Sequence, residues 1–246
     1  MAKGDVLGAH RAAWMEKPVL REIYQDLYRR MAASLVPGAT LEVGGGTGNF
    51  KDYRPGAVST DIQFAPWLDA VCDAHALPFA DSTFANVVLF DVLHHLARPR
   101  LFLGELVRVL SPGGRGVLVE PAITPVSWLA YALLHDEPVR MGEDPLSEGP
   151  LPVCRDPYAA NQGVPTLLFG PVLGRRREAF RRAFPALSVR SVRLLSLFAY
   201  PLSGGFRRWS LVPAGAVRAL LRIEDSLMPV LGPLLAFRML VVLERR

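Results

Sequence analysis

Helical and strand-like patterns of apolar residues alternate along the first half of the chain. Residues 18–35 place apolar side chains at helical spacing with charges between them, and residues 99–110 repeat that pattern. Short apolar runs typical of buried strands lie between and around these helices, at 40–43, 57–62, 68–72, 86–90 and 116–120. This alternation predicts a parallel sheet covered by helices on both faces, which is a doubly wound α/β fold.

The second half of the chain changes character after the fifth predicted strand. From Pro121 to about Gly170 the sequence is rich in Pro and Gly, and it is too long for an ordinary loop. Residues 172–184 resemble an arginine-rich surface helix. Strand-like runs return at 187–199 and 236–243, on either side of the amphipathic segment 211–231. We therefore expect two further strands and an insertion after strand five.

Composition narrows the class of protein. Half of the 246 residues are apolar and the formal net charge is +5, with basic residues scattered among acidic ones, so a nucleic-acid partner is weakly supported. Cys72 and Cys154 suit neither a disulfide framework nor a metal site. The N-terminus lacks the apolar core of a signal peptide. The most hydrophobic stretch, 228–243, holds Pro233 and Arg238 and falls short of the ~20 apolar residues of a membrane span. A cytoplasmic protein is expected, with peripheral membrane contact left open.

A glycine-rich loop follows the first predicted strand. The stretch 41–48 reads LEVGGGTG, and its glycines at 44, 46 and 48 allow a tight turn and close approach of a ligand. The dinucleotide fingerprint would require Gly or Ala at position 49, where the chain has Asn49. The other glycine pattern, acidic-x-Gly-x-Gly-x-Gly, is met at every position by Glu42, Gly44, Gly46 and Gly48.

On these residues the sequence resembles the class I S-adenosylmethionine-dependent methyltransferases, especially the small-molecule group that includes the ubiquinone/menaquinone-biosynthesis type. Further blocks match that family in order and spacing across residues 40–121: CDAHALPF at 72–79, DSTFANVV at 81–88, DVLHHL at 91–96 and RVLSPGG at 108–114. The resemblance implies a mostly parallel seven-stranded sheet of the Rossmann-like methyltransferase type. It also implies S-adenosyl-L-methionine as cofactor and methyl transfer that yields S-adenosylhomocysteine.

The resemblance also assigns roles to individual residues. Glu42 is expected near the methionine amino group, and Asp61, at the end of the second strand, accepts the ribose hydroxyls. Asp73 receives the adenine amino group. The complete set of expected cofactor-binding residues is Glu42, Gly44, Gly45, Gly46, Gly48, Asp61, Ile62, Asp73, Ala74, His75 and Asp91.

The resemblance also divides the chain. We expect a single methyltransferase domain, 1–246, with a helical cap at 1–39 and a cofactor-binding core at 40–121. Residues 122–170 would form a substrate lid, and residues 171–246 the C-terminal half of the sheet. One departure from the family is the short segment 49–56, which leaves room for a crossover helix of about two turns, although such connections usually need a dozen residues.

Two regions offer candidate catalytic groups. His94 and His95 lie at the carboxyl end of the fourth strand, where an imidazole can act as a general base; the alternative is that they only shape the pocket. His135, in the run His135-Asp136-Glu137, is a second candidate base or a lid residue that contacts substrate. Its spacing fits no helical ligand pair, so no metal is expected.

Aromatic residues near the N-terminus leave two interpretations open. Trp14, Tyr24 and Tyr28 would either cover the cofactor or pack an amphipathic helix against the core.

Three classes of function remain after these motifs. We favour a small or lipid-like acceptor, because the Asn-Pro-Pro-Tyr type of signature of nucleic-acid and protein N-methyltransferases is missing after strand four. The first rival is an RNA or protein methyltransferase, supported only by the basic balance and the arginine-rich helix expected at 175–182. The second is a non-catalytic S-adenosylmethionine-binding partner subunit. The sequence leaves the acceptor atom and the oligomeric state open.

Overall fold

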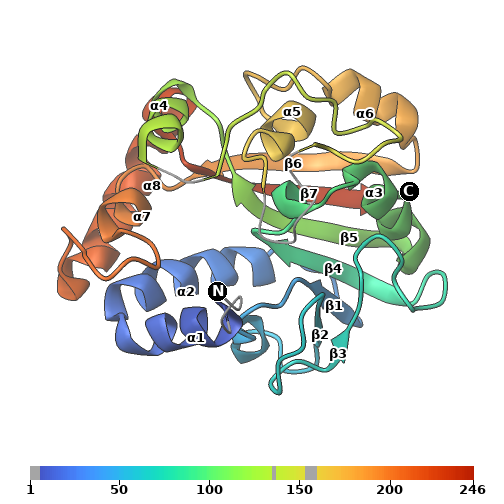
Figure 1. The fold of residues 1–246 in the computed structure, drawn as a ribbon, viewed down its shortest axis with the longest axis horizontal. Helices are drawn as coiled ribbons and strands as arrows, with labels where there is room; N and C mark the ends of the chain where they lie inside the picture. Colours follow the sequence, from blue (N-terminus) through green and yellow to red (C-terminus); the bar gives the residue numbers. More distant parts are fainter. Residues whose placement is uncertain (1–5, 135–136, 153–159) are drawn as a thin grey trace.

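A single sheet runs through the molecule, with helices on both of its faces (Figure 1). The computed structural model describes residues 6–134, 137–152 and 160–246. The strands stand in the order β3-β2-β1-β4-β5-β7-β6, and β7 is antiparallel to both of its neighbours, whereas the other pairings are parallel. The strands are β1 Thr40–Val43, β2 Val58–Asp61, β3 Ala70–Val71, β4 Phe84–Phe90, β5 Leu110–Pro121, β6 Leu187–Leu195 and β7 Arg238–Arg245.

Helices connect the strands and cover the sheet. In chain order they are α1 Val6–Glu16, α2 Pro18–Ala32, η1 Asn49–Asp52, η2 Leu93–His95, α3 Pro99–Val109, α4 Pro125–Leu134, α5 Val164–Phe169, α6 Arg177–Ala183, α7 Ala199–Ser203, η3 Ala214–Ala216 and α8 Val217–Leu235, where η marks a 3-10 helix. Within the described ranges, no helix has both the length and the apolar character needed to cross a bilayer. The cytoplasmic location stays a prediction.

The architecture confirms the expected mostly parallel, seven-stranded doubly wound sheet. Three local expectations were wrong. The connection from β1 to β2 holds a single 3-10 turn, η1, instead of a two-turn helix. The arginine-rich helix begins at Arg177 rather than 172, and the segment 122–170 contains two helices, α4 and α5, where no regular pattern was visible.

Two hydrophobic cores lie on opposite faces of the sheet, because successive strand residues point to opposite sides. Leu89 packs with α3, α5 and α6 on one face, and its neighbour Val88 packs with α2 and α8 on the other. Trp14, Tyr24 and Tyr28 are buried in the second core, which favours packing over the cofactor-cover interpretation. The phenyl rings of Phe50 and Phe102 are fully buried, and burying such a side chain contributes ~1.5–3 kcal/mol.

Lys17 ties the start of α2 to the loop that follows α7. Its Nζ donates to the backbone carbonyls of Ser203, Gly205, Arg207 and Trp209, at 2.6, 2.7, 2.6 and 2.9 Å. These bonds link two segments that are ~190 positions apart in the chain. They are charge-assisted hydrogen bonds, which are stronger than hydrogen bonds between neutral groups. Lys17 therefore closes the side of the molecule formed by α1, α2 and α7.

Lys17→Met should lower the free energy of unfolding by about 1–3 kcal/mol, because four carbonyl groups lose a charged donor while the aliphatic stem stays. Urea denaturation followed by circular dichroism measures this change. Arg222→Ala is the control, since the Arg222 side chain reaches only the Arg218 carbonyl on the surface, at 3.3 Å, and it should change stability by less than about 0.5 kcal/mol. Equal stability of Lys17→Met and the wild type would refute this role.

Candidate active site

The candidate site lies at the carboxyl edge of the parallel strands. In a doubly wound sheet, ligands bind outside this edge. The glycine loop follows β1, Asp61 ends β2, Asp91 follows β4, and the segment beginning at Ala122 follows β5. The sheet thus brings together, at one edge, groups that are far apart in the chain. Glu42 and Ala122, for example, are roughly 80 positions apart.

The glycine loop has a packed side and an open side. Gly44, Gly46 and Gly48 all have positive φ, at +71°, +50° and +75°, a region that other residues rarely adopt. A Cβ on Gly44 would overlap the side chain of Val92, whereas a Cβ on Gly46 would meet no heavy atom nearer than 3.9 Å. Gly46 therefore presents bare backbone to open space, which suits close approach of a ligand.

Asp61 fixes the loop from the end of β2. One carboxylate oxygen accepts from the Gly46 N–H at 3.0 Å, and the other accepts from the Gln63 N–H at 3.0 Å. Each carboxylate oxygen can accept two hydrogen bonds, so both retain acceptor capacity. Asp61 is 8% exposed, and it can hold the loop and still accept ligand hydroxyls.

Two residues that the sequence did not point to hold the outer side of this loop. The Trp67 indole N–H donates to the Gly46 carbonyl at 2.9 Å, and an Arg11 N–H donates to the Thr47 carbonyl at 2.6 Å. The Arg11 guanidinium also lies 4.5 Å from the centre of the Trp67 ring. The signal for Trp67 was a large aromatic residue just after the carboxyl end of β2, but Arg11 on α1 carries no local signal.

Glu42 is a buried carboxyl group behind the loop. Burial raises its pKa to about 7, although the Ser59 hydroxyl donates to it and opposes the shift. Lys51 pairs with Asp69 at 2.6 Å and not with Glu42. A cationic group placed beside Glu42 would therefore stabilise its charged form.

The predicted adenine-side residues are less closely gathered. Asp73 is exposed and accepts from the backbone N–H of His75 at 2.8 Å, and the His75 ring lies 2.7 Å from the same oxygen. The other ring nitrogen of His75 accepts from the Arg98 N–H at 3.2 Å. Ala74 is buried and Ile62 is half exposed at the sheet edge. His75 thus orients Asp73 and links it to the start of α3.

Asp91 is held in a strained backbone conformation by a buried arginine. Its φ is +56°, and its carboxylate pairs with Arg238 at 2.6 Å. Burial opposes ionisation of Asp91, but the Arg238 charge outweighs burial and lowers the pKa of Asp91. The Arg238 guanidinium also lies over Tyr200, 4.2 Å from the ring centre. Arg238, at the start of β7, was noted in the sequence only as an interruption of an apolar run.

A second buried carboxylate organises the histidine pair. Glu120, at the end of β5, accepts from the N–H groups of Val92 and Leu93 at 3.0 and 2.7 Å. Its other oxygen lies 2.7 Å from His94 Nδ1. Burial disfavours the charged imidazole, but Glu120 outweighs it and raises the pKa of His94. Glu120 was not singled out from the sequence, although a charged residue at the end of a buried strand is a signal that could have identified it.

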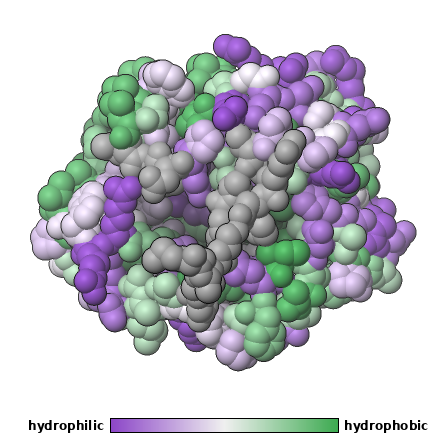
Figure 2. All heavy atoms as spheres, viewed as in Figure 1, coloured by the Kyte–Doolittle hydropathy of each residue, from purple (hydrophilic) through white to green (hydrophobic). Residues whose placement is uncertain are grey.

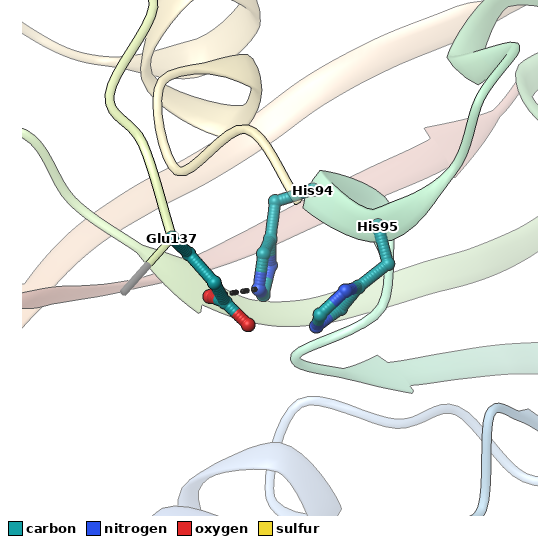
Figure 3. A group of neighbouring side chains, drawn as sticks. All are labelled: His94, His95 and Glu137. Atoms are coloured by element: carbon teal, nitrogen blue, oxygen red, sulfur yellow. Dashed lines mark ion pairs between the residues drawn. The ribbon is translucent and has the colours of Figure 1, made fainter. Parts of the chain in front are cut away.

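The far ring nitrogen of His94 faces Glu137, which comes from the segment after α4 (Figure 3). The two groups are 4.0 Å apart, and the Gln162 side-chain amide donates to the same Glu137 oxygen. The rings of His94 and His95 lie side by side with centroids 4.2 Å apart. His135 and Asp136 lie outside the described residues, so of that predicted trio only Glu137 is placed at the site.

An apolar pocket begins at Ala122, just after the carboxyl end of β5, and lies between the start of α4 and the segment after α5. Its polar neighbours are occupied, because the Thr166 hydroxyl accepts from the Ile123 N–H at 2.8 Å and Thr124 bonds with Ser127. Apolar side chains also gather on the surface of α4, at the upper left of Figure 2. The apolar lining residues are Ile123, Pro125, Val172, Leu173, Pro233 and Met239.

Residues 41–118 match the family model described as a methyltransferase domain, and this segment contains the glycine loop, Asp61, Asp73 and His94. This segment, about a third of the chain, is similar to a methyltransferase domain.

Curated relatives of the methyltransferase domain include two bacterial enzymes. The chain is 34% identical to the demethylmenaquinone methyltransferase of Thermus thermophilus over 38% of this chain and 53% of that protein. It is 33% identical to the demethylmenaquinone methyltransferase of Renibacterium salmoninarum over 36% of this chain and 44% of that protein. The chain thus matches about half the length of these relatives.

Solved structures share the fold at low sequence identity. A methyltransferase of Thermotoga maritima, described as a possible histamine N-methyltransferase, has a TM-score of 0.52 at 14% identity and covers 94% of this chain and 92% of its own. Geranyl diphosphate C-methyltransferase of Streptomyces coelicolor has a TM-score of 0.51 at 13% identity, over 90% and 76%. These likenesses confirm the Rossmann-like methyltransferase fold.

Glu42→Gln should remove a pH-dependent loss of stability. Because the folded-state pKa of Glu42 is raised, its contribution favours the fold below pH ~4.5 and is lost as pH rises to about 7. The variant should therefore gain stability over the wild type at pH ~8, by up to about 3 kcal/mol, and gain little at pH ~4.5. Urea denaturation at both pH values measures this.

Glu22→Gln serves as the control for this prediction. Glu22 bonds with Arg218 on the surface, and this contact lowers the pKa of Glu22, so its removal should not stabilise the protein at high pH. A Glu42→Gln variant with the same pH dependence as the wild type would show that Glu42 does not carry a raised pKa.

Proposed function

We propose that this chain transfers the methyl group of S-adenosyl-L-methionine to a small, lipophilic acceptor, giving S-adenosylhomocysteine. The main support for this proposal is that the open glycine loop, Asp61, the histidine cluster and an apolar pocket all lie along one edge of the sheet. The cofactor would supply a methyl group already activated on a sulfonium, so the protein has mainly to bind and align the two reactants.

The residues of the cofactor half fit this ligand. The backbone of Gly46 faces open space, and Asp61 keeps acceptor capacity for two ribose hydroxyls. Glu42, a buried carboxyl group with a raised pKa, suits a nearby ammonium group such as that of the methionine moiety. Asp73, Ala74, His75 and Ile62 would line the adenine side, and Gly44, Gly45, Gly48 and Asp91 would shape the loop and its floor.

The acceptor half would lie beside the 3-10 turn η2. His94 and His95 project from this turn, and Glu137 and Gln162 reach it from the segment 122–170. These contacts support a substrate-side role for that segment, as the lid hypothesis expects. We propose that His94 and His95 contact the acceptor.

The apolar pocket and the exposed face of α4 support a lipophilic acceptor. On α4, Trp128, Leu129 and Leu133 are about half exposed or more, at 48%, 52% and 71%. Exposed apolar patches of this kind mark ligand or membrane contact. A peripheral membrane contact through α4 would give such an acceptor a short route to the pocket.

The arginine-rich segment gives little support to an RNA acceptor. Arg181 and Arg182 both pair with Glu178 at 3.7 Å, and Arg176 lies 3.4 Å from Asp144. Paired surface arginines offer less free charge for phosphate contacts than an unpaired basic stripe would. Methyl transfer to a pool of RNA, with none to lipid or metabolite pools, would replace the proposed acceptor class.

Gly46→Leu should weaken S-adenosylmethionine binding at least tenfold, about 1.4 kcal/mol, because the new side chain would fill the space that faces the loop. Gly113→Leu is the matched control, since Gly113 also has positive φ, +76°, and no atom within 4 Å of where a Cβ would stand, but it lies near the start of β5, at the far end of that strand from the site. Titration calorimetry on both variants separates backbone strain from loss of the ligand space. Equal affinities would refute the cofactor site.

Asp61→Ala should also weaken cofactor binding at least tenfold, because both the ribose acceptor and the anchor of Gly46 are lost.

A release assay for S-adenosylhomocysteine with quinone-like lipids, small metabolites and RNA then tests the acceptor class. Binding of the cofactor without turnover on any pool would favour the non-catalytic partner subunit.

A further inference from the structure

Three side chains with metal-binding atoms converge beside η2 (Figure 3). His94 and His95 come from the turn itself, and Glu137 comes from the segment after α4. One ligand atom from each of the three lies within 4.8 Å of the other two. We propose that His94, His95 and Glu137 bind a divalent first-row transition metal ion on the acceptor side of the site.

The separations are close to those of a metal centre. With ligand bonds of ~2.0–2.2 Å, two ligands of a tetrahedral ion lie ~3.4 Å apart. The ring nitrogen of His94 and the carboxylate of Glu137 are 4.0 Å apart, so a small side-chain rotation brings them onto one ion. Two imidazoles and one carboxylate suit zinc, manganese, iron or cobalt rather than calcium or magnesium.

The hydrogen bonds around His94 are those of a metal ligand. A ligating histidine usually donates its other ring N–H to a carboxylate, which sets the tautomer. Glu120 lies 2.7 Å from His94 Nδ1, and Nε2, which faces Glu137, would be the ligand atom. The main-chain carbonyl of His94 also accepts from the Asn161 N–H at 2.9 Å, and the next residue, Gln162, donates to Glu137. His94 and Glu137 are thus held by neighbouring groups.

The charge around the cluster also favours a cation. Asp91, Glu120 and Glu137 supply three carboxylates, and Arg238 is the guanidinium that pairs with one of them. These carboxylates create a negative electrostatic potential around the two imidazoles, which suits a cationic ligand.

A second group of possible ligands, Asp91, His94 and Glu120, is also compact, but a metal there would compete with stronger, charge-assisted bonds than the bond from the neutral Gln162 amide to Glu137. Both oxygens of Glu120 accept hydrogen bonds, from the backbone of η2 and from His94, and Asp91 is paired with Arg238. The set with Glu137 is therefore the one that a metal would occupy. The sequence predicted no metal because the spacing within residues 135–137 fits no helical ligand pair. Glu137 is 42 positions from His95 in the chain, roughly a sixth of its length, and the two meet only through the fold.

The role of the ion rests on the proposed function. An ion at this place would bind an acceptor oxygen and favour loss of its proton to water, which makes the oxygen a better nucleophile. Binding of the ion itself does not depend on activity, and it can be measured without any acceptor.

The full-length chain is stripped with EDTA, desalted and titrated with cobalt(II), followed by its visible absorption bands and by calorimetry. We expect one Co²⁺ per chain and at least tenfold weaker binding for His95→Ala and Glu137→Gln. Glu120→Gln should also weaken binding tenfold or more, because the orienting bond to His94 is altered. His10→Gln, on α1 against Phe206, is the control and should bind like the wild type.

S-adenosylmethionine affinity is measured on the same preparations and should stay unchanged in His95→Ala and Glu137→Gln, which shows that they are folded. A wild type that binds no cobalt, zinc or manganese overturns the metal site, as does equal cobalt affinity in the wild type and both ligand variants. Cobalt binding without S-adenosylmethionine binding would instead overturn the proposed function and leave the metal site standing.

Discussion

The carboxylate of Glu120 is the interaction on which the acceptor half of the site depends. It is fully buried at the carboxyl end of β5 and accepts two backbone N–H groups from η2 and a ring contact from His94. Burying a carboxylate is costly unless such partners replace water. Because the bonds cross from β5 to the turn after β4, Glu120 sets the direction in which the histidine pair leaves the sheet.

The cofactor half is built on a different principle. It uses backbone groups of one short loop, held by Asp61 from the neighbouring strand and by Trp67 and Arg11 from outside. All but Arg11 lie within about 30 positions of each other, so local sequence carries most of that geometry. The acceptor half instead assembles side chains from η2, β5 and the segment after α4, and it exists only once the sheet is complete.

This difference explains what the sequence could predict. Strong periodic patterns located the sheet, and the glycine spacing at 44, 46 and 48 located the loop. By contrast, α1 buries only Leu7 and Trp14, so its apolar stripe is too thin to stand out. The turn η1 is set by the nine residues, 49–57, between loop and strand, too few for a helix of ordinary length. The Asp91–Arg238 pair joins residues that are 147 positions apart in the chain, and no local pattern encodes such a pair.

The two halves share one electrostatic feature that bears on the acceptor. Glu42 lies behind the cofactor loop, and Asp91, Glu120 and Glu137 surround the histidine pair, while Arg238 is engaged by Asp91. A sulfonium and an ammonium on the cofactor are complementary to this charge, but an anionic acceptor would meet carboxylates in a site of low dielectric. The arrangement therefore favours an acceptor that enters uncharged through the apolar pocket. If the nucleophile of the acceptor is an oxygen, the arrangement also favours an oxygen that becomes negative only next to a compensating cation.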